Sequence, residues 1–504
     1  MRFLLLVPLL IAAPQDPTVL RVAWGDIQTL DPALAINPQD VRVVEALFDG
    51  LGSATAAVDG PVITFKLADR KWSDGRPVKA SDYVFAWRRA LDPSTGSPWA
   101  FRYRHIRNAW NWHESELLAI RVLMYESEGP AGRNEIVMLA SRVASKRHVR
   151  LLEEAAKTEK EEFPRDVLNS MRATAADRKD LAPSDIGVEA IDDRTLRVTL
   201  ESVKPGFPQL AATTPFFPAP EHVVKARRDR WTHPDHLVTC GAFSVERWTQ
   251  DGIVLARSGA GPDPARVTFA NANRIGDAWP LYERGAVDWI DRTLVPPEKI
   301  PALLETGELR AGPGPWIAFL RLSESLKPSV RKAVAQALDR PLLAKKAGPG
   351  SEATRTLMGG AEALDLDLAA AMVSLANAYP DLKVPPLRLL MWKGSESGDV
   401  ARSVRDQLEE GLALSIRIDL REGPSYQTAL AAGNFDLAFA SYASEVGDPA
   451  GILDLFPDGR KKGEKALVDS QFAIPLIREG EWIVAKPRVI AKPGDPLSKV
   501  TLKK

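Results

Sequence analysis

Alternating apolar and polar positions predict β-strands in the first part of the chain. Residues 19–24 (VLRVAW) and 62–67 (VITFKL) alternate as half-buried strands do. Residues 186–200 (IGVEAIDDRTLRVTL) predict a β-hairpin whose turn falls on the paired aspartates. Two further strands are expected within residues 238–255, where glycines interrupt the apolar run.

Helical spacing occurs between these strands. Residues 40–51 (DVRVVEALFDGL) place apolar side chains on one helical face, with Asp40 as the expected N-cap. The stretch RKWSDGRPVKASDYVFAWRRALDP (70–93) predicts a strand, a Ser-Asp-Gly turn and a helix that Ser81 caps. An Asp-Pro pair ends that helix. The whole stretch is therefore interpreted as architecture, a helix docked behind a strand and a turn.

The pattern changes from residue 114 to residue 181. Charged residues cluster there (KTEKEEFPRD), and the apolar spacing becomes helical, at Ile136, Leu139, Ala140 and Val143. A charge-rich helical segment between strands is typical of an insertion with one solvated face.

The second half of the chain alternates strands with helices. Helices are expected at 329–338 and 400–412, and strands at 387–391, 416–420 and 435–440. This order favours an α/β lobe in which neighbouring strands pair in parallel.

Composition limits the possible partners. The chain has 504 residues, with 66 basic and 66 acidic side chains, so its formal net charge is zero. Binding nucleic acid or an acidic membrane surface usually needs a basic face, so neither is expected as the main partner. The length suffices for several domains. Cys240 is the one cysteine, which rules out an intramolecular disulfide.

The first residues have the pattern of a secretory signal peptide. Met1–Arg2 is a basic start, and residues 3–13 form an apolar run that ends in two alanines and is too short to span a bilayer. Residues 1–15 are therefore predicted to be removed on export, which places the protein in the periplasm or outside the cell. No later segment has ~20 uninterrupted apolar residues, so membrane insertion of the mature chain is not expected.

Motifs for catalysis or metal binding are few. His233, His236 and Cys240 have short spacings that zinc sites use, but a proline keeps the histidines off a shared helical face, and a surface loop is the favoured interpretation. No Gly-x-Ser-x-Gly occurs, and residues 312–315 (GPGP) lack the Lys-Ser/Thr of a phosphate loop. The sequence therefore predicts no catalytic residue, no bound metal and no cofactor, and the protein is not expected to be an enzyme.

Several of these segments follow one another in the order of a known family. The chain resembles the extracellular solute-binding proteins of peptide- and nickel-type ABC importers, which include the oligopeptide-binding proteins. The motifs that carry the resemblance are TLDPAL (29–34), VVEALFDGL (43–51), KWSDGRPVKASDYVFAW (71–87), LDPSTGSPWA (91–100), HIRNA (105–109), IGVEAIDDRTLRVTL (186–200), VTCGAFSVERW (238–248), LYERGAVDWI (281–290), VRKAVAQALDR (330–340) and NFDLAFASYASEVGDP (434–449).

The resemblance implies an α/β, periplasmic-binding-protein-like fold. Two α/β lobes joined by a hinge enclose a solute, and a small extra domain packs on the first lobe. The expected parts are a signal peptide at 1–15, lobe 1 at 16–52, 189–287 and 485–504, a small extra domain at 53–188 with a helical insertion at 111–184, and lobe 2 at 288–484.

The resemblance also implies a receptor that captures peptides, or a related small solute, for an ABC permease. Such a receptor is expected to be a monomer without a cofactor, and it holds extended peptides largely through their main chain. In oligopeptide-binding members a carboxylate after the Phe-Asp-Leu-Ala strand pairs with the peptide's α-ammonium, and here a glutamate takes the place of the usual aspartate. The predicted ligand-binding residues are Glu445, Tyr442, Tyr426, Trp99, Asn37, Gly241 and Asp448.

The chain departs from the family pattern in several places. Pro38 falls where family members pair a peptide with backbone, and proline has no N–H to donate. Lys79 replaces a capping threonine, and the segment between Phe456 and Ala473 is shorter than usual. An alternative therefore stays open, a scaffold or sensory protein on the same fold that binds a protein partner through the helical insertion. An exported hydrolase or metalloenzyme is a third, weaker hypothesis.

Overall fold

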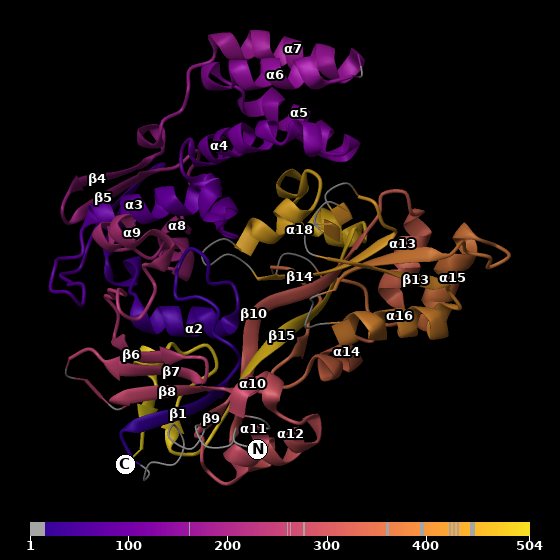
Figure 1. The fold of residues 1–504 in the computed structure, drawn as a ribbon. Coiled ribbons are helices and arrows are strands. Elements are labelled where there is room, and N and C mark those ends of the chain that lie inside the picture. Colours follow the sequence, from indigo (N-terminus) through magenta and orange to yellow (C-terminus); the bar gives the residue numbers. More distant parts are fainter. Residues whose placement is uncertain are drawn as a thin grey trace, which may run out of the picture. The chain divides into compact units, whose positions relative to one another are not determined.

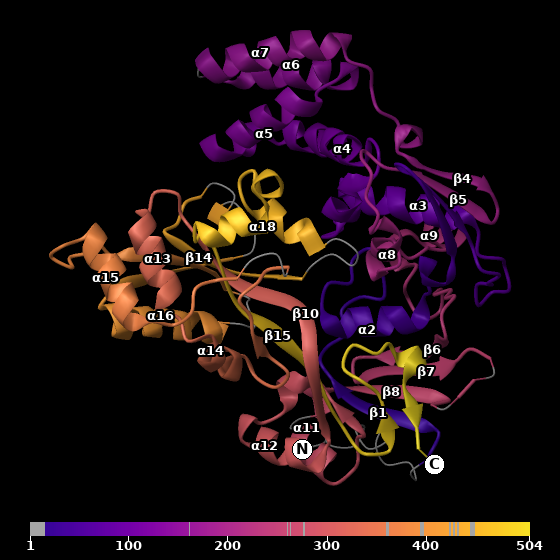
Figure 2. The same ribbon diagram turned by 180° about the vertical axis from the view of Figure 1, so that it is seen from behind.

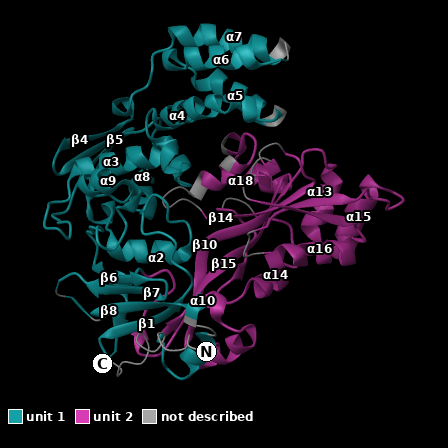
Figure 3. Cartoon of the chain, in the orientation of Figure 1, with its two compact units in different colours: residues 1–288, 496–504 teal, residues 289–495 magenta. Residues whose placement is uncertain are grey.

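The computed structural model describes residues 16–503, except 161, 260, 263, 276–277, 359–361, 394–397, 423–424, 427–428, 431–432 and 444–448. The chain forms two compact units, residues 1–288 with 496–504 and residues 289–495 (Figure 3). The signal peptide predicted at 1–15 lies outside the described residues, as do Glu445 and Asp448. The finer division into two lobes and a small domain stays a prediction.

The first unit contains two sheets. In one, β1 pairs in parallel with β8, and β7 and β6 continue the sheet with antiparallel pairing. The other is an antiparallel sheet in the order β2-β3-β5-β4. The strands predicted at 19–24, 62–67, 186–200 and 238–255 are confirmed, at β1 (Val19–Trp24), β3 (Val62–Lys66), β4 (Val188–Asp192), β5 (Thr195–Thr199), β6 (Phe243–Thr249) and β7 (Gly252–Arg257). The strand predicted to begin the 70–93 stretch is reduced to an isolated bridge between Lys71 and Pro77. Strands β2 (Thr55–Asp59) and β8 (Arg266–Asn271) and the short β17 (Thr501–Leu502) were not predicted.

The first helix of this unit begins earlier than predicted. Helix α2 spans Pro38–Leu47, with Asn37 as its N-cap and proline at its first position, where a missing N–H costs nothing. The prediction of Asp40 as the cap is wrong, because its buried carboxylate accepts a hydrogen bond from the N–H of Gln28 at 2.8 Å. Asp40 thus holds the preceding loop onto the helix.

Helix α3 (Ala80–Leu91) confirms the docked helix of the 70–93 stretch, but Ser81 is not its cap. Lys79 is the N-cap residue and makes no side-chain cap. The carboxylate of Asp82 instead accepts hydrogen bonds from the Lys79 N–H at 2.9 Å and from Trp72 Nε1 at 3.0 Å. One buried acid therefore both caps the helix and ties it to the preceding turn.

The buried face of α3 is centred on Trp87. Its indole donates to the carbonyl of Phe216 at 2.8 Å and packs edge-on against rings of three other segments, those of Tyr103, Phe207 and Phe216. Aromatic packing of this kind adds to simple burial. The remaining short helices of the unit are α8 (Phe207–Leu210), α9 (Glu221–Arg227), α10 (Ala272–Ile275) and α11 (Ala278–Glu283).

The charge-rich segment is helical, as predicted. Helix α4 packs on α5, and α6 on α7 (Figure 1). These helices share an apolar core of their own that includes Leu118, Ile136, Leu152 and Leu168, each fully buried. Their bounds are α4 (Ala109–Leu123), α5 (Pro130–Val143), α6 (Val149–Thr158) and α7 (Glu162–Asp177).

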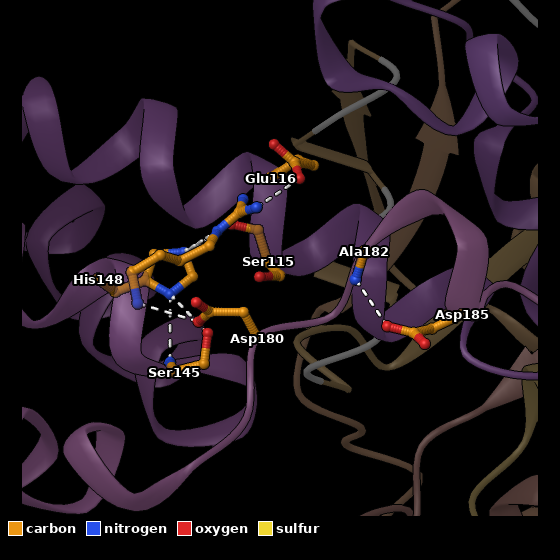
Figure 4. Close-up of polar contacts among 8 residues, drawn as sticks. Ser115, Glu116, Ser145, His148, Asp180, Ala182 and Asp185 are labelled. Carbon is orange, nitrogen blue, oxygen red and sulfur yellow. Dashed lines mark hydrogen bonds and ion pairs between the residues drawn. The ribbon is translucent and has the colours of Figure 1, made fainter.

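A buried histidine lies in this insertion (Figure 4). His148 is fully buried, its Nδ1 accepts the N–H of Ser145 at 3.1 Å, and its Nε2 lies 2.9 Å from the carbonyl of Ser115. Because a carbonyl can only accept, Nε2 carries the proton. Burial lowers the pKa of His148 below its usual 6.5, so the fold keeps this ring neutral.

The second unit is built around a mixed sheet in the order β13-β12-β14-β10-β15-β9. Strand β12 pairs in parallel with both β13 and β14, which confirms the predicted parallel pairing, whereas β10 is antiparallel to β14 and β15. The strands are β9 (Trp289–Ile290), β10 (Leu309–Leu322), β11 (Glu352–Ala353), β12 (Leu387–Trp392), β13 (Ile416–Arg421), β14 (Leu437–Ala443), β15 (Ala473–Ala485) and β16 (Val489–Ile490).

Alternating residues of this sheet face two different cores. Leu320 and Leu437 join the cluster under α13, α15 and α16, while Phe319 and Ala440 join the cluster under α18 (Figures 1 and 2). The helices are α12 (Ile300–Thr306), α13 (Pro328–Gln336), α14 (Arg340–Ala347), α15 (Leu368–Ala378), α16 (Gly398–Leu412) and α18 (Gly459–Asp469). A 3₁₀ helix spans Pro449–Leu455.

Across the part of the chain that the structure describes, no helix is both long enough and apolar enough to cross a bilayer.

Candidate ligand-binding site

The loop before α2 is fixed by a buried ion pair. Arg89 of α3 binds Asp31 with two hydrogen bonds, one of them 3.0 Å from Nη1 to Oδ1. The indole of Trp231 donates to the same carboxylate at 3.3 Å, and the Arg89 guanidinium lies 5.8 Å from the indole centroid. This loop is therefore a rigid part of the first unit.

Two predicted site residues of the first unit lie at this loop. The Trp99 indole donates to the carbonyl of Ala35 at 2.8 Å, and Ser97 Oγ donates to the carbonyl of Ala33 at 2.6 Å. Asn37 follows directly as the cap of α2. The structure thus brings Trp99 close to the segment of Asn37. The hydrogen bonds from Ser97 and Trp99 hold the backbone of that segment in place.

Sequence reasoning missed the neighbours of Trp99. The Arg102 guanidinium lies 4.5 Å from the Trp99 ring centroid, and the Phe101 ring lies 6.3 Å from it. Phe101 and Ile36 are 42% and 56% exposed, so an aromatic and cationic surface surrounds the tryptophan. The alternation of aromatic and basic residues in FRYRH (101–105) was the available signal.

Gly241 lies at the other end of α2 from Asn37. Its N–H donates to the carbonyl of Leu47 at 2.8 Å, and a Cβ at this position would lie 2.5 Å from the Ala46 carbonyl oxygen. Close backbone packing therefore requires glycine here. The predicted contact of Gly241 with a ligand stays a prediction.

Tyr442 belongs to the second unit. It lies near the end of β14, opposite Ile317 of β10, and it is half-buried against the cluster that contains Phe319 and Phe456. Tyr442 and Ala443 are the last described residues before the segment that holds Glu445.

Tyr426 is a core residue of the same unit. It is 5% exposed, packs with Leu390 and Phe435, and donates its hydroxyl to the carbonyl of Phe439 at 2.9 Å. Burial raises the pKa of Tyr426 to about 12. Its role as a ligand contact stays a prediction, and the geometry instead explains why a tyrosine packs here.

Comparison with known proteins decides the family. The model of the bacterial extracellular solute-binding proteins, family 5, matches residues 49–464. The chain belongs to this family.

Relatives match along most of the chain. The probable deoxycholate-binding periplasmic protein YgiS of Escherichia coli is 26% identical over 471 residues, 85% of this chain and 76% of that protein. The periplasmic oligopeptide-binding protein OppA of Salmonella typhimurium is 24% identical over 498 residues, 89% of this chain and 78% of that protein.

A solved family structure has the same fold. The periplasmic oligopeptide-binding protein OppAIV from Borrelia burgdorferi matches with a TM-score of 0.66 and 20% identity, covering 96% of this chain and 100% of that chain. The predicted periplasmic-binding-protein-like α/β fold is therefore confirmed.

In the present chain, strand β14, which carries Tyr442, also carries one partner of a polar pair. Ser441 Oγ donates to Glu479 Oε1 at 2.6 Å, on the face of the sheet opposite to Tyr442. Trp316, paired with Ala443, is 47% exposed. No sequence signal joined these residues, because they come from three separate strands.

The zinc hypothesis finds no geometry to support it. Across the described ranges, no group of three or more His, Cys, Asp or Glu side chains is placed to hold a metal. Cys240 Sγ lies 3.9 Å from the carbonyl of Asp49, and burial raises the pKa of its thiol to about 12. A thiol held neutral in this way is a poor ligand and a poor nucleophile.

Proposed function

We propose that this chain is an exported receptor that captures peptides and delivers them to an ABC permease. The observation that carries the proposal is the family match over residues 49–464, together with full-length relatives named as oligopeptide-binding. Those relatives are named periplasmic, which supports export by a signal peptide at residues 1–15.

In the proposed binding mode, both the backbone and the side chains of the receptor contact the peptide. The proposed contacts in the first unit are Asn37, on the loop that the Asp31–Arg89 pair holds rigid, and Trp99, which donates to that loop, and the proposed contact in the second unit is Tyr442. Peptide main chain pairs with protein main chain, so that many sequences are accepted. Glu445 pairs with the peptide's α-ammonium, and Asp448, Tyr426 and Gly241 complete the predicted set.

The proposed domain movement is a hinge closure around the ligand. The lobes are residues 16–52, 189–287 and 485–504 on one side and 288–484 on the other, with the extra domain at 53–188. The receptor acts as a monomer, needs no cofactor and performs no chemical step, because binding and release are its whole task.

One relative's name offers a different ligand, deoxycholate. Deoxycholate carries a carboxylate and no ammonium group, so Glu445 would repel it rather than pair with it. The glutamate therefore favours a ligand with a cationic end, as a peptide has.

Native mass spectrometry of the purified mature protein, followed by denaturation, tests the proposal. A released mixture of short peptides would support it and would reveal the preferred length. A mass that stays ligand-free after incubation with a peptide library, and with deoxycholate as a parallel sample, would contradict capture of either ligand.

A second candidate function is the scaffold that binds a protein through its insertion. Apolar side chains exposed at the ends and faces of α4 and α5 favour it, with Leu123 73% and Met138 60% exposed. This candidate predicts a ligand-free mass in the same experiment.

A further inference from the structure

The second unit contains a cavity of ≈ 220 Å³ that the proposed function does not use. Phe435, Phe456 and Phe472 are among its apolar lining residues. Lys462 and Glu324 lie at its rim, and Arg321 of β10 lines it from the sheet. The cavity is thus apolar in its lining and charged at its edge.

The cavity lies away from Tyr442, although Tyr426, another residue predicted to bind peptide, packs against its lining residue Phe435. Arg321 and Ile317 lie four positions apart on β10, about 13 Å at 3.3 Å per residue, and Ile317 is the residue that pairs with Tyr442. The rings of Phe319 and Phe456, with centroids 5.7 Å apart, fill the space between. A ligand in the cavity would therefore not touch Tyr442.

Arg321 is buried with only part of its guanidinium satisfied. Arg321 is 8% exposed, and its Nη1 donates to the carbonyls of Leu430 at 2.9 Å and Leu455 at 2.8 Å. Its charge also lies over the rings of Phe435 and Phe456, at 5.2 and 5.8 Å. Nε and Nη2, which together form one edge of the planar guanidinium group, donate to none of the described residues.

Positive charge exceeds negative charge around the cavity. Arg331, 7% exposed, lies behind Phe472 with its guanidinium 4.2 Å from the ring centroid, and it donates to carbonyls only. Lys462 pairs with Glu324 at 3.6 Å. No carboxylate among the described side chains lies within ion-pair distance of Arg321 or Arg331.

Burial lowers the pKa of both arginines, and the nearby Glu324 partly offsets this effect. Both groups stay charged near neutral pH because an arginine starts from so high a value. A buried cation without a carboxylate partner is costly to keep, and an anion supplied from outside would relieve that cost.

We propose that this cavity binds a small carboxylate with an apolar body. The two carboxylate oxygens accept hydrogen bonds from Nε and Nη2 of Arg321, which makes a bidentate ion pair, and Lys462 lies beside it at the rim. The apolar body packs against the phenylalanine rings. Because the volume lies below the usual range for drug-sized ligands, the body is limited to one aryl group or a short alkyl chain.

Isothermal titration calorimetry of the full mature chain with phenylacetate tests this site. Phenylacetamide has the same shape without the charge, and we expect it to bind at least about tenfold more weakly, as loss of a charge-assisted pair predicts. N-acetylphenylalanine represents the last residue of a peptide, so the tighter of the two acids identifies a free acid or a peptide end as the source. Equal affinity for acid and amide, or no binding up to about 10 mM, would overturn the proposal.

A pair of neighbouring lysines supplies matched variants. Lys462→Glu should weaken phenylacetate about threefold to tenfold, whereas Lys461→Glu, the same change at an exposed residue that does not line the cavity, should leave it unchanged. Equal losses in both variants would show a general charge effect and overturn the local site. Glu445→Gln should leave phenylacetate binding unchanged, which separates this test from the peptide proposal.

Discussion

Two arginines of this chain, Arg89 and Arg321, are satisfied in different ways. In the first unit, Arg89 meets the carboxylate of Asp31 in a bidentate pair beside Trp231. In the second unit, Arg321 meets two carbonyls and two aromatic rings, with no carboxylate among the described residues. The residue type is the same, although Arg89 is half-buried and Arg321 is buried, and the two differ in whether the fold itself supplies a carboxylate as the counter-charge.

This difference separates a structural charge from a binding charge. Asp31 and Arg89 together join the loop before α2 to α3, so the pair fixes the backbone to which the Trp99 indole donates. Nε and Nη2 of Arg321, which lines a cavity, donate to none of the described residues. A buried charge completed by the fold gives rigidity, and one left incomplete gives affinity for a ligand.

The largest effect is expected where the completed pair is broken. Asp31→Asn removes the buried carboxylate and leaves the half-buried Arg89 without its counter-ion, which should lower the free energy of unfolding by about 3 kcal/mol, measured by urea denaturation. The control is Glu221→Gln, which breaks an exposed pair with Lys225 in the same unit and should cost under about 1 kcal/mol. Similar losses in both variants would contradict the structural role of the buried pair.

Glu445 of the proposed peptide site is a second charged group whose proposed partner belongs to a ligand. Glu445→Gln should weaken peptides with a free N-terminus by about 2–5 kcal/mol of binding free energy, as expected when a desolvated ion pair loses one partner. N-acetylated peptides are the control, since they lack the ammonium group. If the wild-type protein binds free and acetylated peptides equally well in titration calorimetry, the assigned role of Glu445 is wrong.

Removal of Arg321 sharpens the comparison with Arg89. Arg321→Met leaves the carbonyls of Leu430 and Leu455 without a donor, and we expect a loss of about 1–3 kcal/mol of unfolding free energy. That is less than the loss expected for Asp31→Asn, because no charge is stranded. Urea denaturation measures both, and a reversed order would show that Arg321 is structural in the way that Arg89 is.

His148 is a buried group that the fold keeps neutral instead of pairing. Its pKa is lowered in the folded state, so below about pH 6.5 the unfolded chain takes up a proton that the folded chain refuses. Its contribution to stability is therefore intact above that pH and falls as the pH drops, by at most about 1.4 kcal/mol per pH unit. Urea denaturation between about pH 5 and pH 8 measures this slope.

The variant His148→Gln should flatten the slope while lowering stability at every pH, because it removes the titrating ring and disturbs the contacts with Ser145 and Ser115. His233→Gln, an exposed position in the same unit, should keep the slope of the wild-type protein. An unchanged slope in His148→Gln would assign the pH dependence to other groups.

Local pattern was sufficient for most of the elements. Strand β1 and the hairpin of β4 and β5 follow the alternation of apolar residues, and α16 between β12 and β13 follows the change of period. The order of the family motifs was likewise present in the sequence, and it placed the chain in its family before any distance was known.

Local pattern failed where a side chain's partner comes from elsewhere in the chain. Asp40 and Asp82 have the residue type of a cap, but Asp40 accepts from Gln28, twelve positions before it, and Asp82 also holds Trp72. Tyr426 donates its hydroxyl to the carbonyl of Phe439 within the core, a contact that no local pattern indicated, and its predicted role as a ligand contact stays a prediction.

The sequence alone determined which segments are strands and helices and which family they form together, because periodicity and motif order are properties of neighbouring residues. Only the tertiary structure decided that Arg89 binds a carboxylate 58 positions away, while the partners of Arg321 among the described residues are carbonyls 109 and 134 positions away. The free energy of a buried charge depends on the groups that surround it in space, and the same arginine is therefore structural in one unit and poised for a ligand in the other.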